Sequence, residues 1–443
     1  MTIRPGSKAT RIDLFSISSP QMRTFHFTWF AFFLCFFGWF GIAPLMVYVR
    51  EELHLTKEQI GNIIIASVAI TVLARLVIGW LCDKIGPRIS YSALLIIGSL
   101  PVMGIGLADS YISFLIARLS IGIIGASFVI TQYHTSVMFA PNVVGTANAT
   151  TAGWGNLGGG VTQMVMPLLF GFFAAFGLTT ALSWRFAMII PGAALFLMGI
   201  AYYFGTQDTP GGNFSDIKES HPKFHGGSKN SLANFASAIA DPRVWILFVA
   251  YAACFGIELT INNIAALYYV DRFELSPATA GLIAGLFGLM NIFARTLGGV
   301  FGDRFGSRMG LQGRVTWLAI TLAGQGLFLV LFSQMNVLIL AIATMILFSL
   351  FVQMAEGATF SVVPFVNRRA VGAVSGVVGA GGNAGAVAAG FLFRGGYSYQ
   401  EALLIIGIAV VASAAVALLV RFTVEENTAV EEELNLLLRN ESA

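Results

Sequence analysis

Long apolar runs, separated by short polar stretches, occupy most of the 443-residue chain. Each run is close to or above the ~20 residues with which an α-helix crosses about 30 Å of hydrocarbon. The pattern therefore predicts an all-α membrane protein. We expect twelve transmembrane helices, at residues 25–49, 59–82, 89–108, 112–139, 143–173, 184–204, 244–269, 278–302, 314–333, 335–364, 371–393 and 401–422.

Composition supports this assignment. Hydrophobic residues make up 56% of the chain and charged residues 11%, whereas soluble domains carry about 25% charged residues. The partner that this composition requires is a lipid bilayer, in which helices satisfy their own backbone hydrogen bonds. Residues 1–23 are polar and basic, so no cleavable signal peptide is apparent.

A polar stretch at 206–241 divides the spans into two sets of six. The stretch contains His221 and His225, but a flexible polar linker is a poor metal site, so we expect no metal and no cofactor. The buried-looking cysteines, one each in three apolar segments, predict helix packing and no disulfide. The expected parts are a tail at 1–23, a six-helix half at 24–205, a linker at 206–242, a second six-helix half at 243–424 and a tail at 425–443.

Lysine and arginine gather in alternate loops: the N-terminal tail, the linker, and the loops around residues 84–88, 304–314 and 368–369. The positive-inside rule places such loops in the cytoplasm. We therefore expect a multi-pass protein of the inner (plasma) membrane with both termini cytoplasmic.

Arg75 lies inside an apolar run, eight residues before Asp83. At ~1.5 Å per residue this places the arginine about 12 Å inside the hydrocarbon layer. A lone arginine there costs at least ~2.5–3.5 kcal/mol, so it should face a partner or a cavity. No acidic residue lies between Glu58 and Asp83 to neutralise it on the same helix.

The surrounding motif occurs twice, and each residue of the second copy lies 220 positions after its counterpart. Arg295 repeats Arg75, and both are followed by Gly-x-x-x-Asp-[Lys/Arg]-x-Gly-x-Arg. A repeat at this distance implies two equivalent halves. The motif resembles the loop signature of the major facilitator superfamily, and a solvated basic loop does not explain its duplication. We predict gating roles for Gly79, Asp83, Arg88, Gly299, Asp303 and Arg308.

A second duplicated motif lies in the fifth and eleventh spans. Gly155-Asn156-x-Gly158 aligns with Gly382-Asn383-x-Gly385. Glycines within a membrane let helix backbones touch, and they can also expose backbone amides to a cavity. Close packing alone and a place in the substrate-binding site therefore both stay open for Gly155 and Gly382. The two asparagine amides, however, predict polar groups that face a cavity.

These features together resemble the nitrate/nitrite porter family of the major facilitator superfamily. The resemblance rests on AGWGNLGGG (152–160) with its partner in span eleven, on the two intramembrane arginines, on SVVPFVNRR (361–369) and on GIELTINNIAALYYVDRF (256–273). It extends from about residue 25 to 395 and is closer to the plant, algal and cyanobacterial members.

The resemblance implies that Arg75 and Arg295 clamp the anion and that Asn156 contacts it. Three aromatic residues align with the family's pocket aromatics, namely Phe128, Tyr251 and Phe255. The chemistry is consistent, because nitrate is a flat monoanion and a planar guanidinium offers it two parallel donors. We further expect that the two guanidiniums have no matched carboxylates and therefore require an anionic ligand.

Three other ionisable residues lie within apolar stretches: Glu258, Glu356 and His134. A buried glutamate could carry a coupled proton, or it could form an ion pair with Arg75 or Arg295. Proton symport and exchange for nitrite both remain open. Arg118 and Arg185 lie nearer span ends and are expected to be snorkelling or structural.

The functional prediction is a monomeric secondary transporter of nitrate, and of nitrite, that works by alternating access. The alternatives are a carrier of another small anion, such as a monocarboxylate, and a transporter-like nitrate receptor. The sequence contains no nucleophile constellation, Walker loop or dinucleotide fingerprint, so an enzyme is not expected, nor is a nucleic-acid partner.

Overall fold

The computed structural model describes residues 8–139, 144–215, 236–237, 239–367, 371–429 and 432. Within these residues the chain is helical apart from turns, loops and two isolated bridges, Ala9–Phe139 and Thr209–Gly212. Twelve helical segments of this part are long and apolar enough to cross a membrane. The prediction of an all-α protein with twelve spans is confirmed.

Six spans precede the linker. Their helices are α1 (Pro20–Phe40), η1 (Ala43–Leu45), α2 (Met46–Glu52), α3 (Lys57–Ile85), α4 (Pro87–Gly104), η2 (Ile105–Leu107), α5 (Tyr111–Ile121), η3 (Gly122–Ala126), α6 (Ser127–Met138), α7 (Val144–Ala175) and α8 (Thr180–Gly205). The other six spans follow it. Their helices are α11 (Pro242–Phe273), α12 (Pro277–Leu289), η4 (Met290–Ile292), α13 (Ala294–Met309), α14 (Leu311–Gln334), α15 (Leu338–Val366), α16 (Val371–Arg394) and α17 (Tyr399–Ala417).

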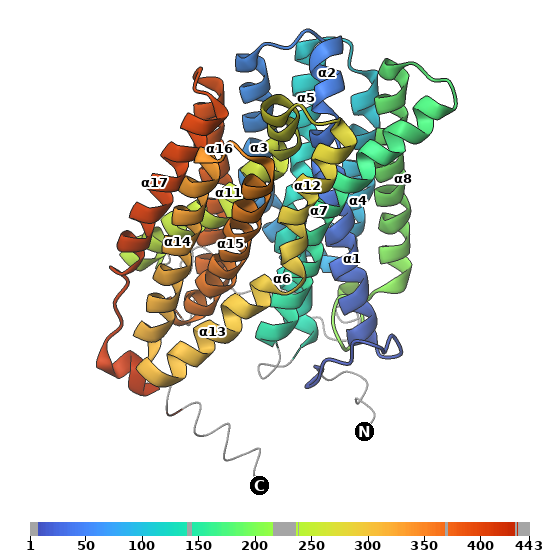
Figure 1. The fold of residues 1–443 in the computed structure, drawn as a ribbon. Coiled ribbons are helices and arrows are strands. Elements are labelled where there is room, and N and C mark those ends of the chain that lie inside the picture. Colours follow the sequence, from blue (N-terminus) through green and yellow to red (C-terminus); the bar gives the residue numbers. More distant parts are fainter. Residues whose placement is uncertain are drawn as a thin grey trace.

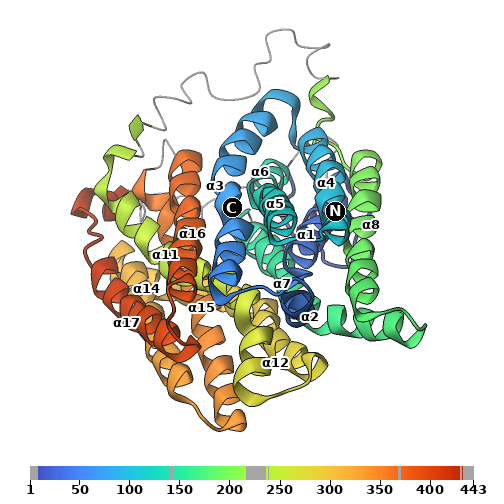
Figure 2. The same ribbon diagram turned by 90° about the horizontal axis from the view of Figure 1, so that it is seen from above.

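The first six spans gather on one side of the molecule and most of the other six on the opposite side (Figures 1 and 2). The start of α1 and the segment that follows α17 lie at the same end, which we call the terminal side. The opposite end, which carries α2 and the start of α3, is called the far side. A common side for both ends is what an even number of spans requires.

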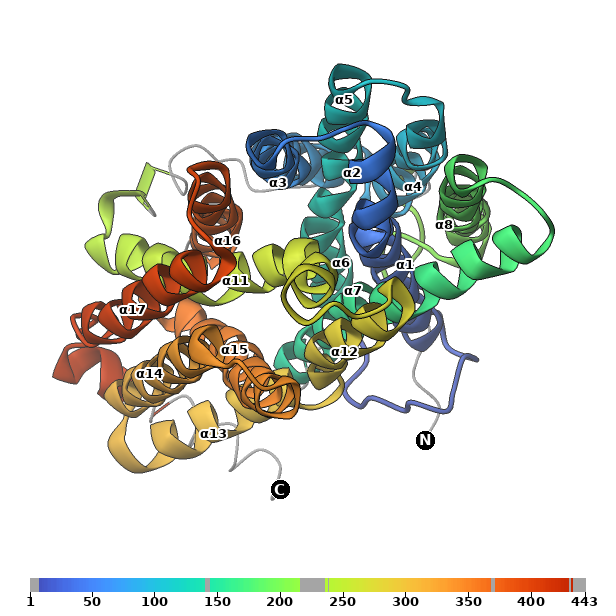
Figure 3. The ribbon, with the colours of Figure 1, turned by 45° about the horizontal axis from the view of Figure 1, so that its top comes forward.

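Two helix pairs join the halves: α3 lies along α16, and α7 lies along α12 (Figures 2 and 3). Each pair combines the second span of one half with the fifth span of the other, so the two contacts are related by the internal repeat. Glycines bring the second pair close. A Cβ atom on Gly288 would lie 2.3 Å from Cα of Gly160, so these backbones touch.

Polar contacts close the far side between the halves. Arg50 donates from Nη1 and Nη2 to the carboxylate of Asp271, at 2.8 and 2.9 Å. Arg394 pairs with Glu58 at 3.0 Å, and Lys57 donates to a backbone carbonyl beyond α16. The structure is therefore a conformer whose far side is shut.

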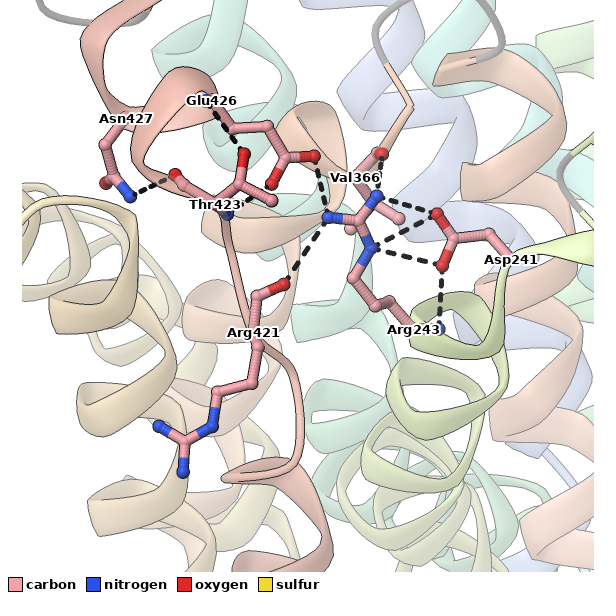
Figure 4. A network of polar contacts seen from close by, with 7 residues as sticks. All are labelled: Asp241, Arg243, Val366, Arg421, Thr423, Glu426 and Asn427. Carbon is pink, nitrogen blue, oxygen red and sulfur yellow. Dashed lines mark hydrogen bonds and ion pairs between the residues drawn. The ribbon is translucent and has the colours of Figure 1, made fainter.

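On the terminal side, Arg243 at the start of α11 ties several segments together (Figure 4). Its guanidinium pairs with Asp241 at 2.8 Å and Glu426 at 2.9 Å, and it donates to the carbonyl of Val366 at 2.9 Å. Burial alone would raise the pKa of Glu426, but hydrogen bonds from Thr423 and Arg243 outweigh it and lower that pKa. The segment after α17 is thereby fixed to the second half.

Several predicted features lie outside the described residues. They are His221 and His225, most of the central linker, and the acidic end of the C-terminal tail. Cys35, Cys82 and Cys254 are buried, which fits the predicted packing role.

Candidate anion-binding site

Arg75 lies deep in α3, with 6% of its surface exposed. Its Nη1 donates to the carbonyl of Gly379 on α16 at 2.8 Å, across the interface between the halves. The guanidinium carbon lies 5.2 Å from the ring centre of Phe128 and 5.7 Å from that of Phe255. Nε and Nη2 have no hydrogen-bond partner among the described residues, and no described carboxylate pairs with this arginine.

Arg295 is held differently. Its Nη1 lies 2.5 Å from Oε2 of Glu356, and the two side chains are 4% and 0% exposed. Its Nη2 donates to the hydroxyl of Tyr251 at 3.2 Å. The expectation that both guanidiniums lack matched carboxylates is therefore wrong for Arg295. The alternative left open for Glu356, an ion pair with an intramembrane arginine, is what the structure shows.

A second buried acid lies beside this pair. The carboxylate of Glu258 accepts from Asn291 at 2.8 Å and from Asn156, on the other half, at 3.1 Å. It also interacts electrostatically with Arg295. Asn156 thus bridges the halves through its Nδ2, while its Oδ1 has no partner in the described part of the chain.

Aromatic rings fill the space between the two arginines. Tyr251 and Phe255 stack with ring centres 5.2 Å apart, and Tyr251 interacts electrostatically with both arginines. Phe128 lies 6.4 Å from Phe255 across the interface. The three predicted aromatics are therefore brought together beside Arg75. The sequence analysis missed Phe360, whose ring centre lies 5.0 Å from that of Tyr251 and 6.2 Å from that of Phe128.

The duplicated glycines make room for these rings. A Cβ atom on Gly382 would lie 2.3 Å from Cδ1 of Phe255, and one on Gly155 would lie 2.0 Å from Cδ1 of Phe32. Both glycines therefore allow an aromatic ring to contact the helix backbone. Asn383 is fully buried, and neither atom of its amide has a partner among the described residues.

The residues predicted to gate lie near the terminal side, away from the arginine pair. Arg88 donates to the carbonyl of Tyr203 at 3.1 Å and lies over its ring. A Cβ on Gly299 would meet nothing within 4 Å, and one on Gly79 would meet only Val129 at 3.8 Å. Close packing at these two glycines is not required in this conformer. Arg308 is exposed, and the side chains of Asp83 and Asp303 lie outside the description.

His134 is not part of the central site. Its Nε2 lies 2.8 Å from the carbonyl of Gln207, and its Nδ1 lies 2.7 Å from the hydroxyl of Tyr202. A carbonyl accepts only, so Nε2 carries the proton and Nδ1 accepts from the tyrosine. Both ring nitrogens are therefore occupied by hydrogen bonds, one to the C-terminal part of α8 and one to the segment that follows it.

Two arginines expected near span ends have different surroundings. Arg185 pairs with Glu52 at 2.6 Å in a half-buried position. Arg118 is 1% exposed and donates to the carbonyl of Trp39 and to Asn263. The snorkelling alternative is therefore wrong for Arg118, which is fully buried.

Asn291 and Phe360 were missed because a single asparagine or phenylalanine in an apolar run carries no signal of its own. Spacing could have found them. Asn291 precedes Arg295 by four residues and Phe360 follows Glu356 by four, which in a helix places each pair on one face.

A bundle of two six-helix halves with a buried cation at their interface defines a membrane carrier of the facilitator type. The family model described as Major Facilitator Superfamily matches residues 28–366 and 251–440. The fold resembles that of a bacterial homolog to the human lysosomal transporter Spinster, with a TM-score of 0.70, 16% identity, and coverage of 91% of this chain and 97% of that one.

Curated relatives narrow the class. The chain is 43% identical to "High affinity nitrate transporter 2.5" of Arabidopsis thaliana, over 89% of this chain and 78% of that protein. It is 32% identical to "Nitrate/nitrite transporter NrtP" of a Picosynechococcus strain, over 83% and 84% of the two chains. The chain belongs to the nitrate/nitrite porter family of the major facilitator superfamily.

Proposed function

We propose that this protein carries nitrate and nitrite across a membrane by alternating access, with Arg75 as the group that holds the anion at the centre of the interface between the halves. The names of the relatives support this substrate class. The observation that carries the proposal is the side chain of Arg75, a buried cation whose hydrogen-bond acceptor is a neutral carbonyl and whose Nε and Nη2 are unpaired in the described structure.

Nε and Nη2 are the two donors on one edge of a guanidinium, and they point in parallel. Two oxygens of a flat oxyanion match that edge, giving a pair of charge-assisted hydrogen bonds. Phe128 and Phe255 beside the guanidinium exclude water and strengthen the interaction. A lysine would supply charge there without the parallel geometry.

Arg295 takes part as the second clamp in this proposal, after its ion pair with Glu356 loosens. The unpaired Nδ2 of Asn383 can donate to the anion, whereas Nδ2 of Asn156 must first leave the carboxylate of Glu258. Tyr251 accepts from Arg295 and interacts electrostatically with both arginines. Gly155 and Gly382 act indirectly, because they let the rings approach.

The gate proposed for the terminal side is formed by the duplicated loop motif. Its members are Gly79, Asp83, Arg88, Gly299, Asp303 and Arg308. The contacts that close the far side, such as Arg50–Asp271, must break when the halves rock the other way. We further propose a monomer in the plasma membrane with cytoplasmic termini, so that the terminal side faces the cytoplasm.

Two coupling modes are compatible with this site. In one, Glu356 or Glu258 takes a proton when the anion competes for Arg295. In the other, nitrite leaving in the opposite direction drives uptake. His134 is the weakest candidate for a proton carrier, because both of its ring nitrogens are bonded away from the arginines.

The test is flux of labelled nitrate into proteoliposomes that contain the purified protein. A proton gradient alone, then internal nitrite alone, is applied; uptake with the first indicates symport and with the second exchange. Stronger inhibition by a monocarboxylate than by unlabelled nitrate would instead establish the alternative carrier. Binding of nitrate without any flux would establish the receptor and overturn the transport proposal.

A further inference from the structure

A third buried arginine, Arg118, lies between the halves and is closer to the far side than Arg75 is. Arg118 belongs to α5 and is 1% exposed. Its Nη1 donates to the carbonyl of Trp39 at 2.8 Å, within its own half, and its Nη2 donates to Oδ1 of Asn263, on the other half, at 2.9 Å. Its Nε has no partner among the described residues.

Both acceptors of Arg118 are neutral, and the described part of the chain gives this side chain no acidic partner. A buried cation without a counter-ion is expensive, and a hydrophobic residue of similar volume would pack at less cost. The hydrogen bond to Asn263 does not by itself require a charged donor, since a neutral amide in place of the guanidinium could donate it. The charge therefore points to an anionic partner in another conformer.

The position of Arg118 follows from its neighbours along α3. A cavity of about 200 Å³ on the far side is lined by Arg50, Lys57 and Ile64, among others. One turn deeper, the backbone carbonyl of Ser67 accepts from the indole N–H of Trp39 at 2.6 Å, and the hydroxyl of Ser67 lies 3.4 Å from Oδ1 of Asn263. Trp39 and Asn263 are the two residues to which Arg118 donates, so Arg118 lies at the level of Ser67.

Arg75 follows Ser67 by eight residues on the same helix, which is about 12 Å. The Arg118–Asn263 hydrogen bond thus lies between the far-side cavity and Arg75. An anion that moves from the cavity to Arg75 passes this level.

We propose that Arg118 is a second anion-binding site, which captures the small oxyanion on its way between the far-side cavity and Arg75. Asn263 belongs to α11, in the half that moves relative to Arg118. When the far side opens, Asn263 withdraws and frees Nη2, while Nη1 stays on the carbonyl of Trp39. The free edge is then Nε with Nη2, the same edge that Arg75 presents.

This inference rests on the proposed function, since the captured ion is the transported one. A different role for the same bond is a strut that holds the far side shut. The two roles predict opposite effects for one substitution. Losing a strut favours the far-side-open state and lowers the KM for the anion on that side. Losing a capture site raises that KM.

The experiment measures KM for nitrate presented on the far side of oriented proteoliposomes, for Arg118→Gln, Arg118→Lys and Asn263→Ala. For Arg118→Gln we expect KM to rise about tenfold or more, because a bidentate charge-assisted contact is lost. Arg118→Lys should give an intermediate rise, since charge remains without the parallel edge. Asn263→Ala should lower KM, because it removes the neutral amide that competes with the anion for Nη2 of Arg118.

Arg185→Gln is the matched control, because it removes the same group from a pair within the first half, and its KM should not change. The proposal is overturned if Arg118→Gln lowers KM as Asn263→Ala does, or leaves it unchanged. If Arg118→Gln does not fold, the Arg118→Lys variant decides by the same sign. Failure of the proposed function looks different, since the unaltered protein would then show no nitrate flux.

Discussion

Nη1 of Arg295 lies 2.5 Å from Oε2 of Glu356, and both side chains are almost completely buried. In the first half, Nη1 of the equivalent arginine, Arg75, donates instead to the backbone carbonyl of Gly379. The internal repeat has therefore produced two arginines at matching positions with different partners. One is ready for an anion in this conformer, and the other is already neutralised by an acid.

Glu356→Gln should raise the affinity for nitrate about tenfold, because the anion no longer competes with a carboxylate for Arg295. The amide oxygen retains one hydrogen bond to the guanidinium, so the variant should fold, with reduced stability. Isothermal titration of the detergent-solubilised protein checks the affinity. A tenfold loss of affinity would show instead that Glu356 orients Arg295 for the anion.

Arg75→Lys should lower nitrate affinity by about tenfold to a hundredfold, because one of two charge-assisted hydrogen bonds, worth ~1.5–3 kcal/mol, is lost. Uptake by proteoliposomes over a range of nitrate concentrations measures this. The matched control is Arg394→Lys, since Arg394 is 43% exposed and pairs with an exposed Glu58. Unaltered uptake by Arg75→Lys would refute the role proposed for this arginine.

The sequence predicted the spans and the arginine pair because each leaves a local signal. Twelve apolar runs set the helices, and a charge within such a run is conspicuous. The pairing of Arg295 with Glu356 could not be predicted in the same way. These residues are 61 positions apart on different helices, and their contact depends on how α13 packs against α15.

The role of the glycines also needed the structure. The sequence analysis expected helix contacts or amides that face a cavity, whereas Gly155 and Gly382 make room for aromatic rings. Arg118 was placed near a span end because its helix is preceded by a short polar break. The structure buries it instead, since the 3-10 segment η3 brings its span against α1 and α3.

Gly382→Ala should displace Phe255 from the site. The added Cβ would lie 2.3 Å from Cδ1 and 3.0 Å from Cβ of that residue, so rotation of the ring alone does not relieve the clash. Overpacking of this kind costs ~1–3 kcal/mol. We expect a lower thermal midpoint, measured by differential scanning fluorimetry, together with a higher KM for nitrate.

Gly171→Ala is the control for this substitution, because a Cβ there meets nothing within 4 Å. It should leave KM unchanged and, since glycine weakens a helix by about 1 kcal/mol relative to alanine, it should not lower the midpoint. If both variants behave alike, contact with Phe255 is not the reason for glycine at 382.

The C-terminal segment should loosen at low pH. The pKa of Glu426 is lowered in the folded protein, so its carboxylate holds Arg243 fully above its ordinary value of about 4.5 and loses this hold as pH falls through the lowered pKa. Hydrogen exchange of residues 423–429, corrected for intrinsic rates, should show faster exchange at pH 3 than at pH 6. Glu426→Gln should exchange fast at both pH values, and a pH-dependence equal to that of the unaltered protein would contradict the assignment.

Asp271→Asn should open the far side. It removes one bidentate, charge-assisted contact from the interface between the halves. Because Arg50 and Asp271 are 28% and 27% exposed, solvent screening limits the contact to about 1 kcal/mol, or roughly a fivefold shift of the conformational equilibrium. Labelling of Ile64→Cys, in the far-side cavity, by a membrane-impermeant maleimide measures that shift.

The three native cysteines are buried, so they contribute little background to this labelling. Glu58→Gln is the control, because its pair with Arg394 is 62% and 43% exposed and should change the rate less than about twofold. Exchanging the charges, as Arg50→Asp with Asp271→Arg, should restore slow labelling, since the attraction survives reversal. Equal rates in Asp271→Asn and the unaltered protein would mean that apolar packing between α3 and α16, and not this ion pair, keeps the far side closed.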